Sequence, residues 1–155
     1  MKKWTGKNSP PMPALVDANV WLPILVESHQ HHAAAMTWWS ERPAASCCWC
    51  RPLQQTVLRL LTNRSVMGAD THTPDDAWHV WEKLVGDIRT AFIPMEPAGL
   101  DDAWRQHIAG RTASPKLWMD AYLAAWAKTA DLAFVTFDSG FKSYSLPDLH
   151  LLKGE

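Results

Sequence analysis

Three aspartates stand among apolar residues, where a carboxylate needs a physical reason. Asp17 ends the apolar run at 14–16, and Asp138 follows the apolar run LAFVTF at 132–137. Asp120 lies inside LWMDAYLAAWA, where its neighbours are almost all apolar. Burying a carboxylate in such surroundings is costly unless it is hydrogen-bonded, paired with a cation or bound to a metal.

Each aspartate also has an explanation that involves no chemistry. Asp17 could cap the helix that follows it, and Asp138, in FDSGF, could begin an Asx-turn closed by Gly140. Asp120 could pair with a buried Lys or Arg. Three convergent carboxylates, however, repel one another unless a cation lies among them. Hard cations such as Mg²⁺ and Mn²⁺ take oxygen ligands of this kind, so the joint pattern favours a metal site.

The order of apolar runs predicts strands that alternate with helices. Strands are expected at 14–17, 44–50, 91–95, 132–137 and 149–152. Helices are expected at 19–27, 31–42, 52–63, 73–85, 99–110 and 114–130, with a loop at 64–72. This alternation predicts an α/β fold in which helices cover both faces of a parallel sheet.

The predicted sheet gives the aspartates a common location. In an open parallel sheet, ligands bind beyond the carboxyl ends of the strands, where the strand order reverses. If the strands that precede Asp17 and Asp138 are neighbours, both carboxylates leave the same edge. The helix at 114–130 leads into the strand at 132–137, so Asp120, in its N-terminal half, is expected near that edge too.

The composition excludes some classes of protein. The chain has 155 residues, 47% hydrophobic and 20% charged, which suits one globular domain. Its net charge of -1 gives no overall basic field for nucleic acid, so RNA binding would need a local patch or a metal site. Residues 1–13 are expected to form a flexible arm ahead of a single domain at 14–155, and Met12 could be the native start. The sequence has no apolar stretch of membrane-spanning length, which predicts a soluble, cytoplasmic protein.

Two further clusters could be mistaken for metal sites. Cys47, Cys48 and Cys50 have no second Cys or His pair at zinc spacing and are expected to be buried, reduced thiols on a core strand. The histidines of SHQHH, at 29, 31 and 32, are expected to face solvent in a polar loop.

Four segments in order resemble the PIN domain, and in particular the VapC-type toxins of toxin–antitoxin pairs. The segments are VDANVWL, CRPLQQTVLRLLTN, PKLWMDAYLAAWA and VTFDSGF. The resemblance covers residues 14–152 and implies a three-layer α/β/α sandwich with a mostly parallel sheet of four to five strands. It also implies Mg²⁺- or Mn²⁺-dependent cleavage of RNA, which a partner antitoxin blocks.

The resemblance assigns roles by position. Asp17, Asp120 and Asp138 match the acidic metal ligands of the family. Asn19 matches a polar residue that supports the first of these acids, and Thr136 matches the hydroxyl residue two positions before the last.

One position departs from the family pattern. Many PIN domains carry a Glu on the helix after the second strand, and Gln54 falls there in this sequence. An amide keeps an acceptor oxygen but loses the charge. We therefore expect one firmly held metal ion, with Gln54 orienting a metal-bound water. The candidates for contact with the RNA backbone are Lys116 and Arg111, whereas Arg59 is more simply a solvated surface residue.

Other functions compete with this one. A phosphoacceptor receiver domain would need an acidic pair after the first strand, where only Asp17 is found. A nucleotide-binding fold would need a glycine-rich loop after that strand, and DANVWL has none. A PIN-like module that binds an antitoxin or RNA without cutting stays open, because Gln54 replaces an acid.

The resemblance and the ten tryptophans suggest partners. An antitoxin is expected to bind a groove lined by residues 19–63, and a homodimer is expected. Trp21, Trp38 and Trp39 are candidate anchors at that surface, since Trp is enriched at interfaces. The alternative is that these three side chains belong to the core.

Overall fold

The computed structural model describes residues 11–154. Its strands are β1 (Ala14–Val16), β2 (Cys47–Trp49), β3 (Thr90–Phe92), β4 (Ala133–Thr136) and β5 (Leu149–Leu151). Its helices are α1 (Ala18–Leu25), α2 (His32–Ser40), α3 (Arg51–Leu61), α4 (Arg64–Met67), α5 (Pro74–Val85), α6 (Leu100–Ile108) and α7 (Leu117–Thr129). Two 3-10 turns, η1 (Gly68–Asp70) and η2 (Ser139–Ser143), complete the order.

The five strands form one parallel sheet in the order β3-β2-β1-β4-β5. The chain moves outward from β1 to β2 and β3, then crosses back to place β4 on the other side of β1. The strand order therefore reverses between β1 and β4, where Val16 lies in register with Val135. The two strands are neighbours, which meets the condition on which the expected location of Asp17 and Asp138 depends.

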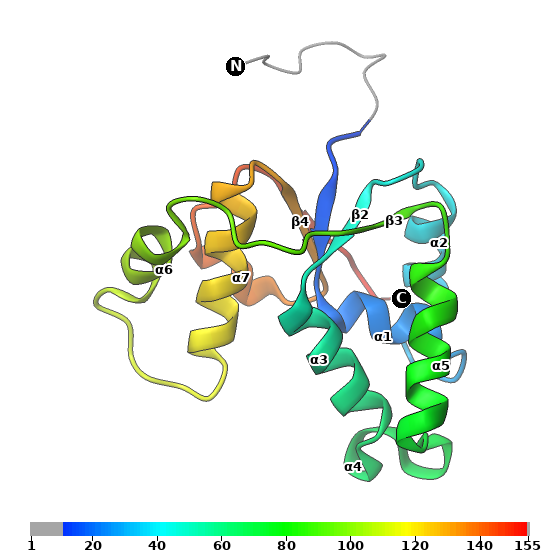
Figure 1. Ribbon diagram of the computed structural model, residues 1–155. Helices are drawn as coiled ribbons and strands as arrows, with labels where there is room; N and C mark the ends of the chain where they lie inside the picture. The colour runs from blue at the N-terminus through cyan, green and yellow to red at the C-terminus, as the bar shows by residue number, and fades with distance from the viewer. Residues whose placement is uncertain (1–10, 155) are drawn as a thin grey trace.

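Helices cover both faces of the sheet, as the alternation of elements predicts. Figure 1 shows α6 and α7 on one side and α1, α2, α3 and α5 on the other. This three-layer arrangement confirms the predicted α/β/α sandwich. It follows from the right-handed crossovers of parallel strands, which put the connections on opposite faces when the chain changes direction.

A cluster of tryptophans fills the layer that holds α1, α2 and α5. The tryptophan cluster consists of Trp21, Trp39, Trp49 and Trp81, which are buried and meet edge to face with ring centroids 5.0–6.4 Å apart. Such contacts add to the free energy that the buried aromatic area already contributes.

The prediction that Trp21, Trp38 and Trp39 anchor a partner is wrong, because all three side chains are buried in the core. Arginine side chains cover two of them from outside. The guanidinium of Arg42 lies 5.1 Å from the centre of the Trp38 ring, and that of Arg89 lies 4.1 Å from the Trp39 ring. The core alternative is therefore the correct one.

Other differences from the sequence prediction are local. The segment at 64–72 is not a plain loop, because it contains α4 and η1. The histidines of SHQHH are partly buried rather than solvent-facing. His31 stacks on Phe137 with ring centroids 4.5 Å apart, and His32 Nδ1 lies 2.6 Å from the carbonyl oxygen of Pro23.

The apolar run at α7 is also less buried than expected. Trp118 is 55% exposed, and Met119 is exposed beside it, so the first turn of this helix reaches solvent. The prediction for the three cysteines is confirmed, since Cys47, Cys48 and Cys50 are buried and make no disulfide.

The predicted N-terminal arm is described only in its last residues. Most of the predicted arm lies outside the described residues, and Met12 packs against the core just ahead of β1. Within residues 11–154, no helix is both long enough and apolar enough to cross a membrane.

Candidate active site at the carboxyl edge of the sheet

The three predicted aspartates come together where β1 and β4 end. Asp17 follows β1, Asp138 begins η2 after β4, and Asp120 lies in the first turn of α7. Burial raises the pKa of Asp17, and the nearby charges of Asp120 and Asp138 raise it further. We call this group of three carboxylates the acidic edge.

Thr136 joins two of the three aspartates. Its hydroxyl donates to Asp17 Oδ2 at 2.7 Å and accepts the backbone N–H of Asp138 at 3.0 Å. Asn19 holds the other side of this group, with Nδ2 3.0 Å from Thr136 Oγ1 and Oδ1 3.1 Å from the backbone N of Phe137. Both predicted supporting residues therefore lie in the hydrogen-bond network that connects β1, α1 and β4.

Helix capping does not explain why an aspartate occupies position 17. It occupies the N-cap position of α1, but its side chain makes no capping hydrogen bond there. Only 9% of the residue is exposed, and burial raises its pKa to about 6 despite the hydrogen bond from Thr136. The fold thus keeps a carboxyl group where its charged form is destabilised, which is typical of functional sites.

Asp120 and Asp138 have opposite electrostatic environments. Burial raises the pKa of Asp120, an effect that the charge of Lys116 partly offsets. A hydrogen bond from Lys116 lowers the pKa of Asp138, and the backbone N–H of Gly140 also donates to this carboxylate at 2.8 Å. The predicted Asx-turn at Asp138 therefore exists alongside its place at the acidic edge.

Gly140 is needed for this turn. A Cβ atom on Gly140 would lie 2.9 Å from Asp138 Oδ1, closer than side chains tolerate. Any larger residue would push the carboxylate away from its present position.

The chemistry of these donors fits a hard divalent cation. The acidic edge offers carboxylate oxygens, which Mg²⁺ and Mn²⁺ prefer, and a cation would relieve the repulsion and the burial cost at Asp17. Among residues 11–154, no three Asp, Glu, His or Cys side chains already stand in an arrangement that would hold a metal ion. Lys116, whose side chain is 69% exposed, instead pairs with Asp138.

Comparison with known proteins shows the family to which this chain belongs. The family model of the PIN domain matches residues 14–146. The chain belongs to the PIN-domain family. Ribonuclease VapC41 of Mycobacterium tuberculosis is 39% identical over 142 residues, which are 89% of this chain and 97% of the relative.

Two solved structures share the PIN-domain fold. VapBC2 from Rickettsia felis, bound to a DNA fragment from its promoter, has a TM-score of 0.64 at 10% identity, over 92% of this chain and 100% of its own. VapC20 of Mycobacterium tuberculosis, described as a toxin that cleaves the sarcin–ricin loop, has a TM-score of 0.63 at 18% identity, over 84% of this chain and 93% of its own.

Gln54 lies in the first turns of α3 of this PIN domain and is only 4% exposed. Its side-chain oxygen accepts a hydrogen bond from Arg51 Nη1. Arg51 was not among the residues singled out from the sequence. The one signal that could have found it is its place three residues before Gln54 on the same helix.

A cavity of about 380 Å³ adjoins the acidic edge on the side of α7. Asp120, Asp138 and the two predicted RNA contacts, Lys116 and Arg111, all line it. Arg111 is held by hydrogen bonds to the hydroxyl and carbonyl oxygens of Ser143 and lies 4.0 Å from the centre of the Tyr144 ring. Sequence reasoning missed Ser143 and Tyr144, because neither lies beside an acid in the sequence.

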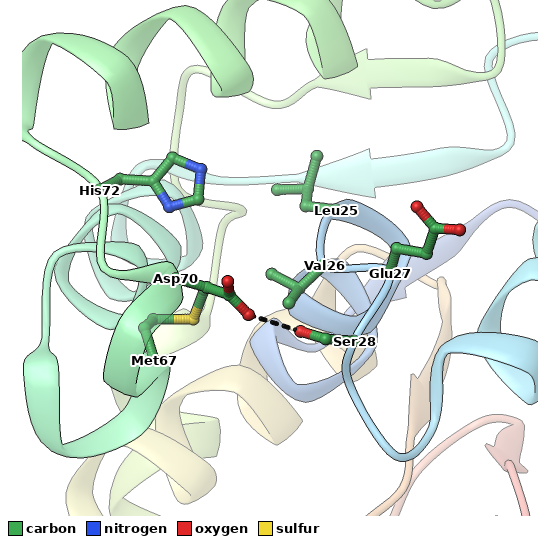
Figure 2. Close-up of a pocket in the computed structure, with 7 residues that line it drawn as sticks. All are labelled: Leu25, Val26, Glu27, Ser28, Met67, Asp70 and His72. Carbon is green, nitrogen blue, oxygen red and sulfur yellow. Dashed lines mark hydrogen bonds between the residues drawn. The ribbon is translucent and has the colours of Figure 1, made fainter.

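A second cavity of the PIN domain, of about 590 Å³, lies apart from the acidic edge. Figure 2 shows the side chains that line it, from the end of α1 and from the segment of α4 and η1. Ser28 donates to Asp70 Oδ2 at 2.8 Å across this cavity. None of the three aspartates of the acidic edge lines it, so its volume does not make it the candidate active site.

Proposed function

We propose that this protein is a metal-dependent endoribonuclease and the toxin of a toxin–antitoxin pair. The observation that carries the proposal is the convergence of Asp17, Asp120 and Asp138 where the strand order reverses, with Thr136 bonded to two of them. The likeness to ribonuclease VapC41 supports the reaction class. The reaction is hydrolysis, in which a water oxygen bonds to phosphorus and the leaving oxygen of the RNA takes a proton.

Asp17, Asp120 and Asp138 would hold Mg²⁺ or Mn²⁺. When bound, such an ion lowers the pKa of a water molecule and offsets charge on the phosphate oxygens. Thr136 and Asn19 keep the Asp17 carboxylate in place through the hydrogen bonds described above. Gln54 is proposed to orient a water molecule. Its side-chain oxygen has two lone pairs, and Arg51 uses only one of them, so the other can accept a hydrogen bond from water.

Arg111 and Lys116 are proposed to contact the RNA backbone. Arg111 suits this role because Ser143 and Tyr144 fix its guanidinium at the cavity beside Asp120 and Asp138. Lys116 would leave Asp138 when the metal binds there and become available to a phosphate oxygen. That exchange would cost little, because exposed ion pairs contribute only about 0–1 kcal/mol.

The test is RNA cleavage by purified wild-type protein and the Asp17→Asn variant. The substrates are structured RNAs that include a sarcin–ricin hairpin, with Mg²⁺, Mn²⁺ or chelator present. We expect metal-dependent cutting that Asp17→Asn abolishes and that Asp75→Asn, an exposed acid on α5, retains. Cutting in chelator, or full activity of Asp17→Asn, would contradict the proposal.

A module that binds without cutting is the alternative, and Gln54 in place of an acid favours it. Calorimetric titration with Mn²⁺ separates the two functions. The nuclease binds Mn²⁺ and loses this binding in Asp17→Asn, whereas a module that only binds partners shows no Mn²⁺ binding.

An antitoxin is the proposed protein partner, since one fold neighbour is a VapBC2 structure. We propose the early helices, residues 19–63, as its docking region. Trp21, Trp38 and Trp39 are not among the proposed contacts, because they are buried in the core. Co-expression with the neighbouring gene product should give a complex that co-purifies and no longer cuts RNA. A homodimer is also proposed, and light scattering of the purified protein would give its mass.

A further inference from the structure

Arg51 stands on the opposite side of the acidic edge from Lys116 and Arg111. The register pairs Leu15 of β1 with Cys48 of β2, so Asp17 lies beside Cys50, the residue just before α3. Arg51 is therefore the first residue of the helix that begins next to Asp17. Its side chain is exposed, and its guanidinium donates to the buried oxygen of Gln54.

Aromatic rings also fix the direction of this side chain. The Arg51 guanidinium lies 4.7 Å from the centre of the Phe92 ring and 5.9 Å from the Trp49 ring. These two rings stack on each other, with centroids 4.2 Å apart, because Trp49 and Phe92 are paired in register across β2 and β3. An Arg held by a hydrogen bond and two rings loses less conformational freedom when it binds a ligand.

The charge of Arg51 is not neutralised by an acid. Within the part of the chain that the structure describes, the ion pairs join other residues, and none includes Arg51. Glu96 lines the same small cavity as Arg51, but its carboxylate is directed to the Tyr122 hydroxyl at 2.8 Å and forms no ion pair with Arg51. Lys116, by contrast, is already paired with Asp138.

The position of Arg51 is also unfavourable for the helix itself. It is the first residue of α3, whose first turn holds no acid and whose N-cap makes no side-chain hydrogen bond. The positive end of the helix dipole disfavours a cation there and favours an anion. The positive charge of Arg51 adds to the partial positive charge at the start of α3. The two together favour an anionic ligand at this place.

We propose that Arg51 binds a phosphate oxygen of the RNA from the side of α3, with Gln54 as the residue that positions its guanidinium. The fixed positive charge stands next to the position where many PIN domains carry an acid. The RNA backbone would thus be held from both sides of the acidic edge, by Arg51 on one side and Arg111 on the other. This inference rests on the proposed ribonuclease function and names a further substrate contact for it.

The experiment is a salt titration of RNA binding. The probe is a fluorescein-labelled single-stranded RNA of mixed sequence, measured by anisotropy in Mg²⁺. All proteins carry Asp120→Asn, so that the RNA is not consumed. Arg51→Ala should raise the Kd about fivefold and reduce the slope of log Kd against log salt by about 0.7, the value for one lost phosphate contact on a single strand.

Three further variants separate binding from folding. Arg51→Lys keeps the charge and should keep the salt slope. Gln54→Leu should raise the Kd about twofold while leaving the slope unchanged, because the cation remains but is less well fixed. Arg59→Ala, on the same helix and also exposed, is the matched control and should change neither quantity. Thermal melts of each variant exclude unfolding as the cause.

The outcomes distinguish this proposal from the ribonuclease proposal. If Arg51→Ala binds RNA like Arg59→Ala, with the same slope, the role of Arg51 is overturned while the nuclease stands. If RNA binding depends on Arg51 but the protein without Asp120→Asn cuts no RNA, the nuclease proposal fails and the contact stands. If the protein does not bind the probe RNA, the role of Arg51 is overturned, and the cleavage assay on structured RNAs decides the nuclease proposal by itself.

Discussion

The tryptophan cluster and the acidic edge are neighbours along the chain, yet they have opposite effects on the stability of the fold. One backbone hydrogen bond joins them, from the N–H of Trp21 to the carbonyl oxygen of Asp17 at 3.1 Å. On one side, buried rings meet edge to face. On the other side, the buried carboxyl group of Asp17 has a pKa of about 6, and the charges of two further aspartates destabilise its ionised form. The first turn of α1 thus divides a region that stabilises the fold from a region that costs stability.

The largest effect should come from breaking the tryptophan cluster. Trp81 is almost fully buried and contacts both Trp21 and Trp49. Trp81→Ala should lower the free energy of unfolding by about 3–5 kcal/mol, because it leaves a cavity in the core. Urea denaturation measures this loss. Metal-dependent cleavage per folded molecule should stay near the wild-type value, and its disappearance would mean that the two regions are coupled.

Removing a charge from the acidic edge should raise, and not lower, the free energy of unfolding. In chelator at pH 7, Asp17→Asn should raise the free energy of unfolding by about 2–3 kcal/mol, since it removes a charge that burial destabilises. The raised pKa means that the folded state binds more protons than the unfolded state. The wild type should therefore lose stability as the pH rises from about 4 to about 6, and the variant should lose less, because only the contribution of Asp17 is removed.

Denaturation midpoints across that pH window, for wild type and Asp17→Asn together, measure the effect. Adding Mn²⁺ should stabilise the wild type and not the variant. An Asp17→Asn protein that is less stable than wild type at pH 7 would show that the buried charge of Asp17 does not destabilise the fold.

The hydrogen bonds of Thr136 should contribute a smaller amount to the stability of the acidic edge. Thr136→Val keeps the shape but leaves Asp17 without its donor and the N–H of Asp138 without its acceptor. We expect a loss of about 1–2 kcal/mol in stability. The pKa of Asp17 should rise further, since the Thr136 hydroxyl lowers it. The acid limb of the pH–activity profile should then move to higher pH, whereas Thr136→Ser should restore the wild-type profile.

The smallest effect should come from a tryptophan outside the cluster. Trp118 is 55% exposed and meets Trp104 edge to face. Trp118→Ala should change stability by less than about 0.5 kcal/mol, as is usual at exposed positions. A thermal melt compared with that of Trp81→Ala is sufficient to check it. A loss as large as that of Trp81→Ala would show that α6 and α7 depend on this exposed ring.

The sequence predicted the acidic edge better than the tryptophans, and the reason is geometric. The alternation of strands and helices predicts a parallel sheet, and in a parallel sheet the residues after the strands, Asp17 and Asp138 included, leave the same edge. The order of the strands, which makes β1 and β4 neighbours, comes only from the structure. Trp38 and Trp39 are adjacent on a short helix with apolar residues on most sides. Their rings lie against side chains from other parts of the chain, Trp21 under Trp39 and Arg89 over it, and such contacts are not visible in the sequence pattern.

The contact between Arg51 and Phe92 was beyond sequence reasoning for a similar reason. Phe92 comes from a different strand, 41 positions after Arg51, and the pairing of β2 with β3 places its ring beside the guanidinium. Likewise, the position of Arg111 depends on Ser143 and Tyr144, at the end of η2, which are more than 30 positions away along the chain.

The burial of the three cysteines has a practical consequence for spectroscopy. Desolvation raises the pKa of Cys47, Cys48 and Cys50 to about 11, so at neutral pH these thiols stay protonated and unreactive. Maleimide dyes and spin labels should therefore ignore the native thiols in the folded protein. A single cysteine introduced on the surface, for example at Arg59, would carry one label at a known place without any native residue being replaced in the core.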